Sequence, residues 1–524
     1  MSPTGFRLTL IIMALWCACF PNLVRAEAAT NLIPNPGFVG AQDTAGLPEG
    51  WQRQPGRIPG VAPSLVYICR VSGYPDRLLA IEGGPDRQGR VWCRIDNIRP
   101  HTDYRLDFTA YRPKFTNGVY LEVEIFGQRH LINQHFSYGR VQPIFLRVNS
   151  GNTRGATRLV VANPHREVLA FGSPVLRVAP PPGERGPAQD VSVRLPNFFP
   201  VGMYAAKPED LPDIRAAGFN AVQSYDAHPD IIRRMAAASA RLGLKYLANF
   251  RGKPASLLQE LTGKPEILGF YIEDEPEGRS VPPGEIEALK KSLQREDPGV
   301  LTAVAMLRPQ MVEAYREAAD VFMIDPYPVP HLPMTWLSDS LAEAARYVPK
   351  ERLWAVIQAF GGEKWARHGW PRPPTFLEMR CLTYLAVVQG AHGLFYFSYP
   401  EVRADNTSWE GLKQIAAELR QLRTWLVTPE APEVLQMEIT SPFQVDAAGR
   451  PAVHFCQKSR GQENLLILVN VIDRPVSFYL HGFGSQVPWL TEMFNKHKAV
   501  VRDGNIREEL GPYEVRIYSY RRED

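Results

Sequence analysis

The sequence predicts a closed (β/α)₈ barrel with a β-sandwich domain on each side. The chain has 524 residues, and single domains usually stop growing at about 250–300 residues, so we expect two or three domains. From about 195 to 427, short apolar runs alternate with amphipathic helical stretches, which is typical of βα units and a parallel sheet. The flanking segments instead alternate polar and apolar residues with a period of two, as β-sandwiches do.

The first 26 residues have the pattern of a secretory signal peptide. An apolar run extends from Leu8 to Phe20 after a short basic start, and Val24-Arg25-Ala26 provides the small residues of a cleavage site. The run is shorter than the ~20 apolar residues of a spanning helix, so we expect a secreted or periplasmic protein rather than a membrane anchor. Removing residues 1–26 lowers the formal net charge from +4 to +2, because Arg7 and Arg25 leave without any acid. Such a small charge excludes an electrostatic footprint for nucleic acid.

Four cysteines remain beyond this segment: Cys69, Cys93, Cys381 and Cys456. Their wide spacing excludes the CxxC pairs of zinc sites. Cys69 and Cys93 lie in one strand-rich region, where we expect either a disulfide in an oxidising compartment or two buried free thiols.

Residues 30–180 contain short β-branched and aromatic runs separated by Gly, Pro and Asp clusters, which predicts a β-sandwich. The opening Asn31-Leu-Ile-Pro-Asn-Pro-Gly-Phe38, followed by Gly46-Leu-Pro-Glu-Gly-Trp51, resembles the first strand of jelly-roll carbohydrate-binding modules. The resemblance implies a module that either binds sugar or serves as a packing partner. Residues 181–194 are expected to be a linker, because this stretch begins too rich in Pro and Gly for a helix or central strand.

The central segment, 195–427, contains eight strand candidates, the number that a closed barrel requires. They are Phe198–Tyr204, Ala221–Tyr225, Lys245–Phe250, Gly269–Glu273, Leu301–Leu307, Val321–Asp325, Trp354–Phe360 and Gly393–Tyr399. The helices expected between them are Pro208–Ala217, Pro229–Leu242, Pro283–Gln294, Arg308–Ala319, Leu337–Tyr347 and Thr375–Gln389. The absence of a GxGxxG or GxxxxGKS sequence excludes the usual nucleotide-binding motifs.

The last segment, 430–524, again alternates with a period of two and predicts a second β-sandwich. Its ending, from Leu510 to Tyr518, resembles the final strand of the C-terminal β-domains that follow many glycoside hydrolase barrels. In those proteins the domain is chiefly structural.

The fourth strand runs directly into the carboxylates Glu273, Asp274, Glu275 and Glu277. Adjacent carboxylates repel one another, and in a barrel of this type the reactive groups lie at the carboxyl ends of the strands. The segment resembles the fourth strand of barrel glycoside hydrolases, in which an Asn-Glu-Pro or Asp-Glu-Pro triplet carries the general acid. This resemblance implies that Glu275 is the proton donor and that Asp274 raises its pKa.

The second catalytic group departs from the pattern of the retaining barrel hydrolases. Their nucleophile is a Glu at the end of the seventh strand, where this chain has Gln358, and an amide forms no stable glycosyl ester. Two alternatives stay open. Asp274 could orient a 2-acetamido group as an internal nucleophile, as in substrate-assisted hexosaminidases. Asp325 on the sixth strand could instead activate water in an inverting reaction, or serve only as a hydrogen-bonding neighbour.

Aromatic and fixed polar groups at one end of a barrel are typical of sugar binding. We expect the substrate-binding residues to be Tyr204, Tyr225, Arg251, Tyr327, Gln358, Trp365 and Tyr399.

The stretch from Arg372 to Arg380, with Tyr384 and the run from Gly390 to Phe397, also resembles glycoside hydrolase-like proteins. Together these resemblances imply a secreted glycoside hydrolase that acts on a poly- or oligosaccharide, with no cofactor and no metal site. The rival interpretations are a barrel that binds polysaccharide without cleaving it and a structural or adhesion protein.

Overall fold

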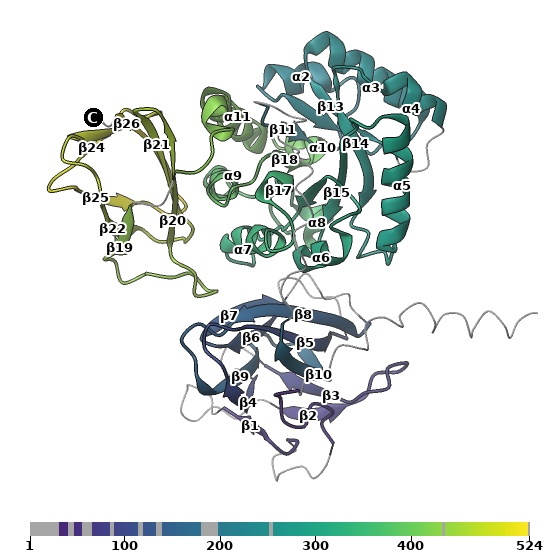
Figure 1. The fold of residues 1–524 in the computed structure, drawn as a ribbon, viewed down its shortest axis with the longest axis vertical. Coiled ribbons are helices and arrows are strands. Elements are labelled where there is room, and N and C mark those ends of the chain that lie inside the picture. Colours follow the sequence, from purple (N-terminus) through teal and green to yellow (C-terminus); the bar gives the residue numbers. More distant parts are fainter. Residues whose placement is uncertain are drawn as a thin grey trace, which may run out of the picture.

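The structure is a computed structural model that describes residues 31–39, 47–54, 65–83, 89–113, 119–132, 139–179, 198–250, 255–431 and 435–521. Figure 1 shows two sheet domains and a barrel in chain order. The expected signal peptide, 1–26, and the expected linker, 181–194, lie outside the described residues.

The N-terminal domain is a sandwich of two antiparallel sheets, each with five strands in the described part. One sheet has the order β1 (Trp51–Arg53), β4 (Gly89–Ile98), β9 (Gly155–Asn163), β6 (Leu121–Ile125) and β7 (Gln128–Ile132). The other has the order β2 (Val66–Cys69), β3 (Leu78–Glu82), β10 (Val168–Val178), β5 (Asp103–Tyr111) and β8 (Gln142–Asn149). Buried side chains alternate along β4, β5 and β6, as the period of two predicts. Cys69 and Cys93 lie in different sheets as free thiols.

The central domain is a closed barrel of parallel strands, and all eight predicted strands are confirmed in the part of the chain that the structure describes. In order around the barrel they are β11 (Val201–Met203), β12 (Ala221–Gln223), β13 (Lys245–Asn249), β14 (Ile267–Asp274), β15 (Thr302–Met306), β16 (Val321–Ile324), β17 (Leu353–Gln358) and β18 (Leu394–Phe397). Because successive side chains point to opposite faces, the strands form an inner core that includes Met323, Trp354 and Phe395, and an outer core against the helices.

The outer layer contains α2 (Leu211–Ala216), α3 (Pro229–Leu242), α4 (Ala255–Leu261), α5 (Pro283–Glu296), η1 (Pro309–Met311), α6 (Val312–Tyr315), α7 (Thr335–Ala344), η2 (Lys350–Arg352), α8 (Glu363–Ala366), α9 (Phe376–Val388), α10 (Tyr399–Ala404) and α11 (Asn406–Leu426). The predicted helix at 308–319 is shorter than expected, since η1 and α6 take its place. Helix α9 begins with a capping box between Thr375 and Glu378. It is buried on all sides from Glu378 to Val388, because it lies between the barrel and the C-terminal domain.

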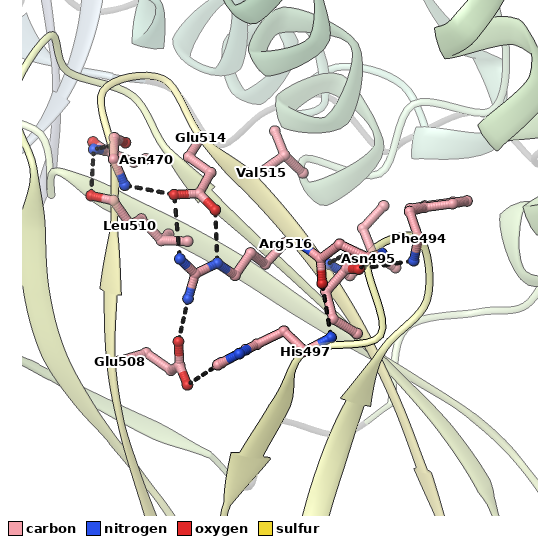
Figure 2. Close-up of polar contacts among 12 residues, drawn as sticks. Asn470, Phe494, Asn495, His497, Glu508, Leu510, Glu514, Val515 and Arg516 are labelled. Carbon is pink, nitrogen blue, oxygen red and sulfur yellow. Dashed lines mark hydrogen bonds and ion pairs between the residues drawn. The ribbon is translucent and has the colours of Figure 1, made fainter.

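The C-terminal domain contains a three-stranded and a five-stranded sheet in its described part. The first consists of β19 (Gln436–Ile439), β22 (Val476–His481) and β25 (Asn505–Leu510), and the second of β20 (Val453–Arg460), β21 (Glu463–Asn470), β26 (Val515–Arg521), β23 (Trp489–Glu492) and β24 (Lys498–Val500). Figure 2 shows a polar network between the two sheets. Arg516 of β26 donates to Glu514 at 2.7 Å and to Glu508 of β25, and the His497 imidazole lies 3.3 Å from Glu508. Because each charged side chain of this network has a partner of opposite charge or a hydrogen bond, these groups can lie between the two sheets.

The buried ion pair between Lys290 and Asp320 joins helix α5 to the start of β16. Lys290 Nζ lies 3.0 Å from Asp320 Oδ1, and the two side chains are 7% and 0% exposed. Asp320 Oδ2 also accepts hydrogen bonds from the backbone N–H and the hydroxyl of Thr302, both at 2.9 Å. One residue thus ties the beginnings of β15 and β16 to the helix that covers them.

We expect Lys290→Met to lower the free energy of unfolding of the barrel by about 3 kcal/mol, because removing one partner leaves a buried charge without its counter-ion. Chemical unfolding followed by tryptophan fluorescence measures this. The matched control is Lys291→Met, since Lys291 is 68% exposed and should cost less than about 1 kcal/mol. Equal losses in the two variants would contradict a role for the buried pair.

Candidate active site

The carboxylates expected at the carboxyl ends of the barrel strands lie together in the structure. Glu275 directly follows β14, and Asp325 directly follows β16. The intervening strand β15 contributes the small residues Ala303 and Ala305 to the inner core. Side chains from alternate strands therefore meet across it, as in the layered interior of such barrels.

The carboxyl groups of Glu275 and Asp325 are hydrogen-bonded to each other. Burial raises the pKa of Glu275, and the Asp274 carboxylate raises it further. Burial also raises the pKa of Asp325 well above its ordinary value, with a further contribution from Glu275 and Glu277. Two carboxylates form such a contact only with a proton between them, so the pair behaves as one unit in which Asp325 takes up the first proton.

This contact bears on the two roles considered for Asp325. A hydrogen bond places the two carboxyl oxygens about 3 Å apart. A base that activates water across a sugar ring needs a separation of ~6.5–9.5 Å, and a nucleophile needs about 5 Å. Asp325 is only 4% exposed, whereas Glu275 is partly exposed. The structure thus favours Asp325 as a hydrogen-bonding neighbour of Glu275, and its role as a water-activating base stays a prediction.

The backbone at Glu275 adopts a left-handed conformation, with φ of 44°. Its N–H still donates to Ala305 at 3.1 Å, and its carbonyl accepts from Gly278 at 3.0 Å. Strand β14 thus ends in a tight turn at the carboxyl that the sequence predicts to be the general acid. Left-handed conformations cost non-glycine residues about 1–3 kcal/mol and concentrate at functional sites.

Asp274 is held by tyrosine hydroxyls rather than by the acid pair. Tyr271 donates a short hydrogen bond to Asp274 Oδ1, and the Tyr225 hydroxyl lies 3.5 Å from the same oxygen. The side chain is 39% exposed, and Arg279 lies 4.0 Å from Oδ2. Asp274 can therefore accept a further hydrogen bond from a bound molecule while its orientation stays fixed.

Glu277 is a buried carboxyl that the sequence did not single out as functional. Its Oε1 accepts from the backbone N–H of Arg308 at 2.7 Å. Burial raises the pKa of Glu277 to about 7, and the Glu275 carboxylate contributes to the shift. Its neighbour Glu273 is also buried and pairs with Arg279 at 2.7 Å. The four carboxylates of this segment therefore have different partners, and the repulsion that remains contributes to the raised pKa values of Glu275 and Glu277.

Gln358 at the end of β17 is completely buried, and backbone groups use both ends of its amide. Its Oε1 accepts from the N–H of Val329 at 2.9 Å, and its Nε2 donates to the carbonyl of the same residue at 2.9 Å and to Phe360 at 3.3 Å. The amide of Gln358 is therefore occupied by backbone groups in this structure, and its contact with substrate stays a prediction. An ionised glutamate would leave the Val329 carbonyl without its donor, because a carboxylate only accepts hydrogen bonds.

Aromatic rings form a continuous cluster beside the carboxylates. The predicted residues Tyr225, Tyr327 and Trp365 belong to it, and they remain predicted sugar contacts. Phe397 lies between them, with ring centroids 6.4 Å from Tyr225 and 5.9 Å from Tyr327. Phe360 continues the cluster at 4.9 Å from Tyr327 and 4.6 Å from Trp365. Trp365 Nε1 donates to Glu401 at 2.9 Å, which fixes the indole.

Tyr204 also belongs to this cluster, with ring centroids 5.7 Å from Tyr225 and 5.9 Å from Phe397, whereas Tyr399 lies in the outer layer. Tyr204 is only 1% exposed, and its hydroxyl lies 3.4 Å from the sulfur of Met323 inside the barrel. Tyr399 packs in the outer layer, where its ring meets Trp409 at 5.5 Å and its hydroxyl donates to Asp213 at 2.9 Å. In this structure both side chains contact protein groups, and sugar binding by either tyrosine stays a prediction. Arg251 lies outside the described residues.

In the described parts of the chain, no group of three or more His, Cys, Asp or Glu residues is arranged to hold a metal ion. The described helices also include none that is both long and apolar enough to cross a membrane.

We expect Gln358→Glu to destabilise the barrel by about 1–3 kcal/mol, because it buries a carboxylate against a carbonyl that loses its donor. Chemical unfolding of the variant measures this. Gln421→Glu is the matched control, since Gln421 is exposed on α11. A variant as stable as the control would contradict the structural role of the amide.

We expect Asp325→Asn to stabilise the protein at pH 8 by about 0.5–2 kcal/mol, because it removes a buried acid that the fold does not otherwise neutralise. The pKa of Asp325 is raised on folding, so its contribution is complete below the ordinary Asp pKa and is lost as pH rises through the folded value. The gain over the wild type should therefore shrink towards pH 4. Denaturant unfolding at both pH values tests this, with the exposed Asp473→Asn as control; a destabilised variant at pH 8 would be the contrary result.

No protein-family model and no curated protein sequence matches the chain. Solved structures with a similar fold include an alpha-amylase from Anoxybacillus, described as a new glycosyl hydrolase subclass, with 11% identity, a TM-score of 0.42, and coverage of 60% of this chain and 90% of that one. A noncanonic maltogenic alpha-amylase from Thermotoga neapolitana has 10% identity, a TM-score of 0.43, and coverage of 63% and 100%. A cyclomaltodextrinase has 10% identity, a TM-score of 0.43, and coverage of 81% and 97%. The likeness to these glycoside hydrolases is one of fold: a parallel eight-stranded barrel with flanking β-sheet domains.

Proposed function

We propose that the protein is a glycoside hydrolase in which Glu275 is the general acid. The observation that carries this proposal is the proton-sharing pair of Glu275 and Asp325 at the carboxyl ends of β14 and β16. General acid catalysis at neutral pH needs a carboxyl with a raised pKa next to the reacting bond. The aromatic cluster beside the pair supports a carbohydrate as the substrate class. The N-terminal sequence pattern supports export.

In this proposal Glu275 gives its proton to the glycosidic oxygen as the bond to the anomeric carbon breaks. The carboxylate that forms on Glu275 accepts the hydrogen bond from protonated Asp325, which lies behind it. Burial raises the pKa of Asp325 and so favours its protonated form. Water takes the place of the departing alcohol and attacks the oxocarbenium-like anomeric carbon before the sugar leaves the site, so no covalent intermediate forms. Glu275 takes the proton from that water, and the pair returns to its starting state.

The position of Asp274 favours a second, narrower candidate, namely substrate-assisted cleavage of a 2-acetamido sugar. Asp274 is fixed by Tyr271 and partly exposed, and it can accept the N–H of an acetamido group. That group's carbonyl oxygen would then attack the anomeric carbon as Glu275 protonates the leaving group. This route needs no carboxylate on β17, where Gln358 is committed to the backbone. It also needs no second carboxylate to activate water.

We expect Glu275→Gln to reduce hydrolysis of aryl glycosides by about 10²–10⁴-fold, because the amide cannot donate the proton. Release of the aryl alcohol by the mature wild type and the variant, on substrates with and without a 2-acetamido group, measures the loss. Glu410→Gln, an isosteric change at an exposed residue of α11, is the control and should retain wild-type rates.

Turnover confined to 2-acetamido substrates would support the role of Asp274, and turnover of plain glycosides would exclude it. A wild-type protein that binds glycans without cleaving any of them would overturn the hydrolase proposal in favour of polysaccharide binding.

A further inference from the structure

The N-terminal sandwich docks on the barrel at the loop that follows β15, as Figure 1 shows for β7, β8 and α6. Arg147 of β8 pairs with Glu313 of α6 at 3.3 Å, and Arg346 after α7 donates to the carbonyl of Arg147 at 3.2 Å. The loop after β16 is also close, since the charge of its His331 contributes, after burial, to lowering the pKa of His165 in the sandwich. The loop after β16 begins at Asp325, and the loop after β15 begins on the strand that separates Asp325 from Glu275.

Arg308 connects the sandwich to the carboxylates directly. It is the second residue after β15, and its backbone N–H donates to Glu277 Oε1 at 2.7 Å. Its guanidinium Nη2 donates to the side-chain oxygen of Gln142, the first residue of β8, at 2.5 Å. The hydrogen bond to Gln142 therefore fixes one end of this guanidinium.

The charged and titratable groups around Glu277 come from several elements. Glu273 and Glu275 belong to its own segment, Asp325 comes from the end of β16, and the Tyr315 hydroxyl comes from α6. The Arg308 guanidinium is a cation that opposes their negative charge, and it lowers the pKa of both Glu277 and Glu275 against the larger effect of burial. Arg279 acts in the same direction on Glu275 from the other side, where it pairs with Glu273.

We propose that the N-terminal sandwich influences the catalytic carboxylates through Gln142. Gln142 is a positioning residue that holds Arg308 near Glu277 and the acid pair. In this arrangement the sandwich contributes no group that touches substrate. It supplies an acceptor that keeps a cation beside the carboxylates. If the hydrogen bond is lost, the guanidinium turns towards solvent and its charge is screened, so protonation of Glu277 and Glu275 becomes easier.

The ionisation of Glu277 tests this without any substrate. The carbonyl stretch of its protonated carboxyl is followed by infrared difference spectroscopy across a pH series, and its band is assigned with Glu277→Gln. We expect Gln142→Met, which keeps the volume and removes the acceptor, to move the midpoint upward by a few tenths to about one pH unit. Gln142→Ala should give the same shift. An unchanged or lowered midpoint in the folded Gln142→Met protein would overturn the proposal.

The matched control is Glu313→Gln, which weakens docking at the same interface without contacting Arg308. It should leave the midpoint unchanged, and an equal shift would mean that docking in general, not Gln142, sets the ionisation. The effect on catalysis rests on the proposed glycosidase activity. We expect the alkaline limb of the pH–rate profile, which reports loss of the general acid's proton, to move to higher pH in Gln142→Met, and a moved midpoint with an unmoved profile would refute the link to the acid. If the wild type cleaves no glycan, the proposed function fails, and the infrared midpoint alone decides the role of Gln142.

Discussion

Closure of eight parallel strands into one ring is the constraint on which the rest of the structure depends. A closed barrel brings the carboxyl ends of all strands to one rim, and side chains from alternate strands share a layer. Glu275 and Asp325 meet only because β14 and β16 are separated by a strand whose inner residues are alanines. The left-handed turn at Glu275 and the tyrosine bound to Asp274 then give neighbouring carboxylates different environments. The closed barrel thus determines where the carboxylates lie, and their local contacts determine their pKa values.

The three domains contribute unequally to this rim. The C-terminal domain supports the barrel from outside, since α9 is buried between the two and Arg380 donates to the carbonyl of Val515 at 2.7 Å. The N-terminal sandwich instead contacts the loop after β15, next to the carboxylates. The resemblance to carbohydrate-binding modules concerns the fold of this domain. Its contacts with the barrel run through Gln142 and Arg308 to Glu277. A sandwich can serve the active site without binding sugar itself.

The barrel strands were predictable because each is a buried apolar run bounded by polar residues, a pattern that local sequence carries. Short helices such as α8, with four residues, have no such pattern and were missed. Glu275 and Asp274 could be found because they follow a strand. Tyr271 and Glu277 could not, because their roles depend on which side chains the turn after β14 brings together. Tyr399 follows β18 in sequence, but it turns with α10 into the outer layer.

The amide of Gln358 also limits how this barrel can change its chemistry. The same peptide group of Val329 both donates to and accepts from that amide, so strand β17 and the loop after β16 are specified together. A carboxylate nucleophile introduced there by one substitution would lower the stability of the barrel, because the Val329 carbonyl would lose its donor. An engineer, or natural selection, would have to rebuild the loop in the same step, and each intermediate along a stepwise path would carry an unsatisfied buried group. A change at strand β17 towards the carboxylate of double-displacement glycosidases would therefore require a change in the loop after β16 as well.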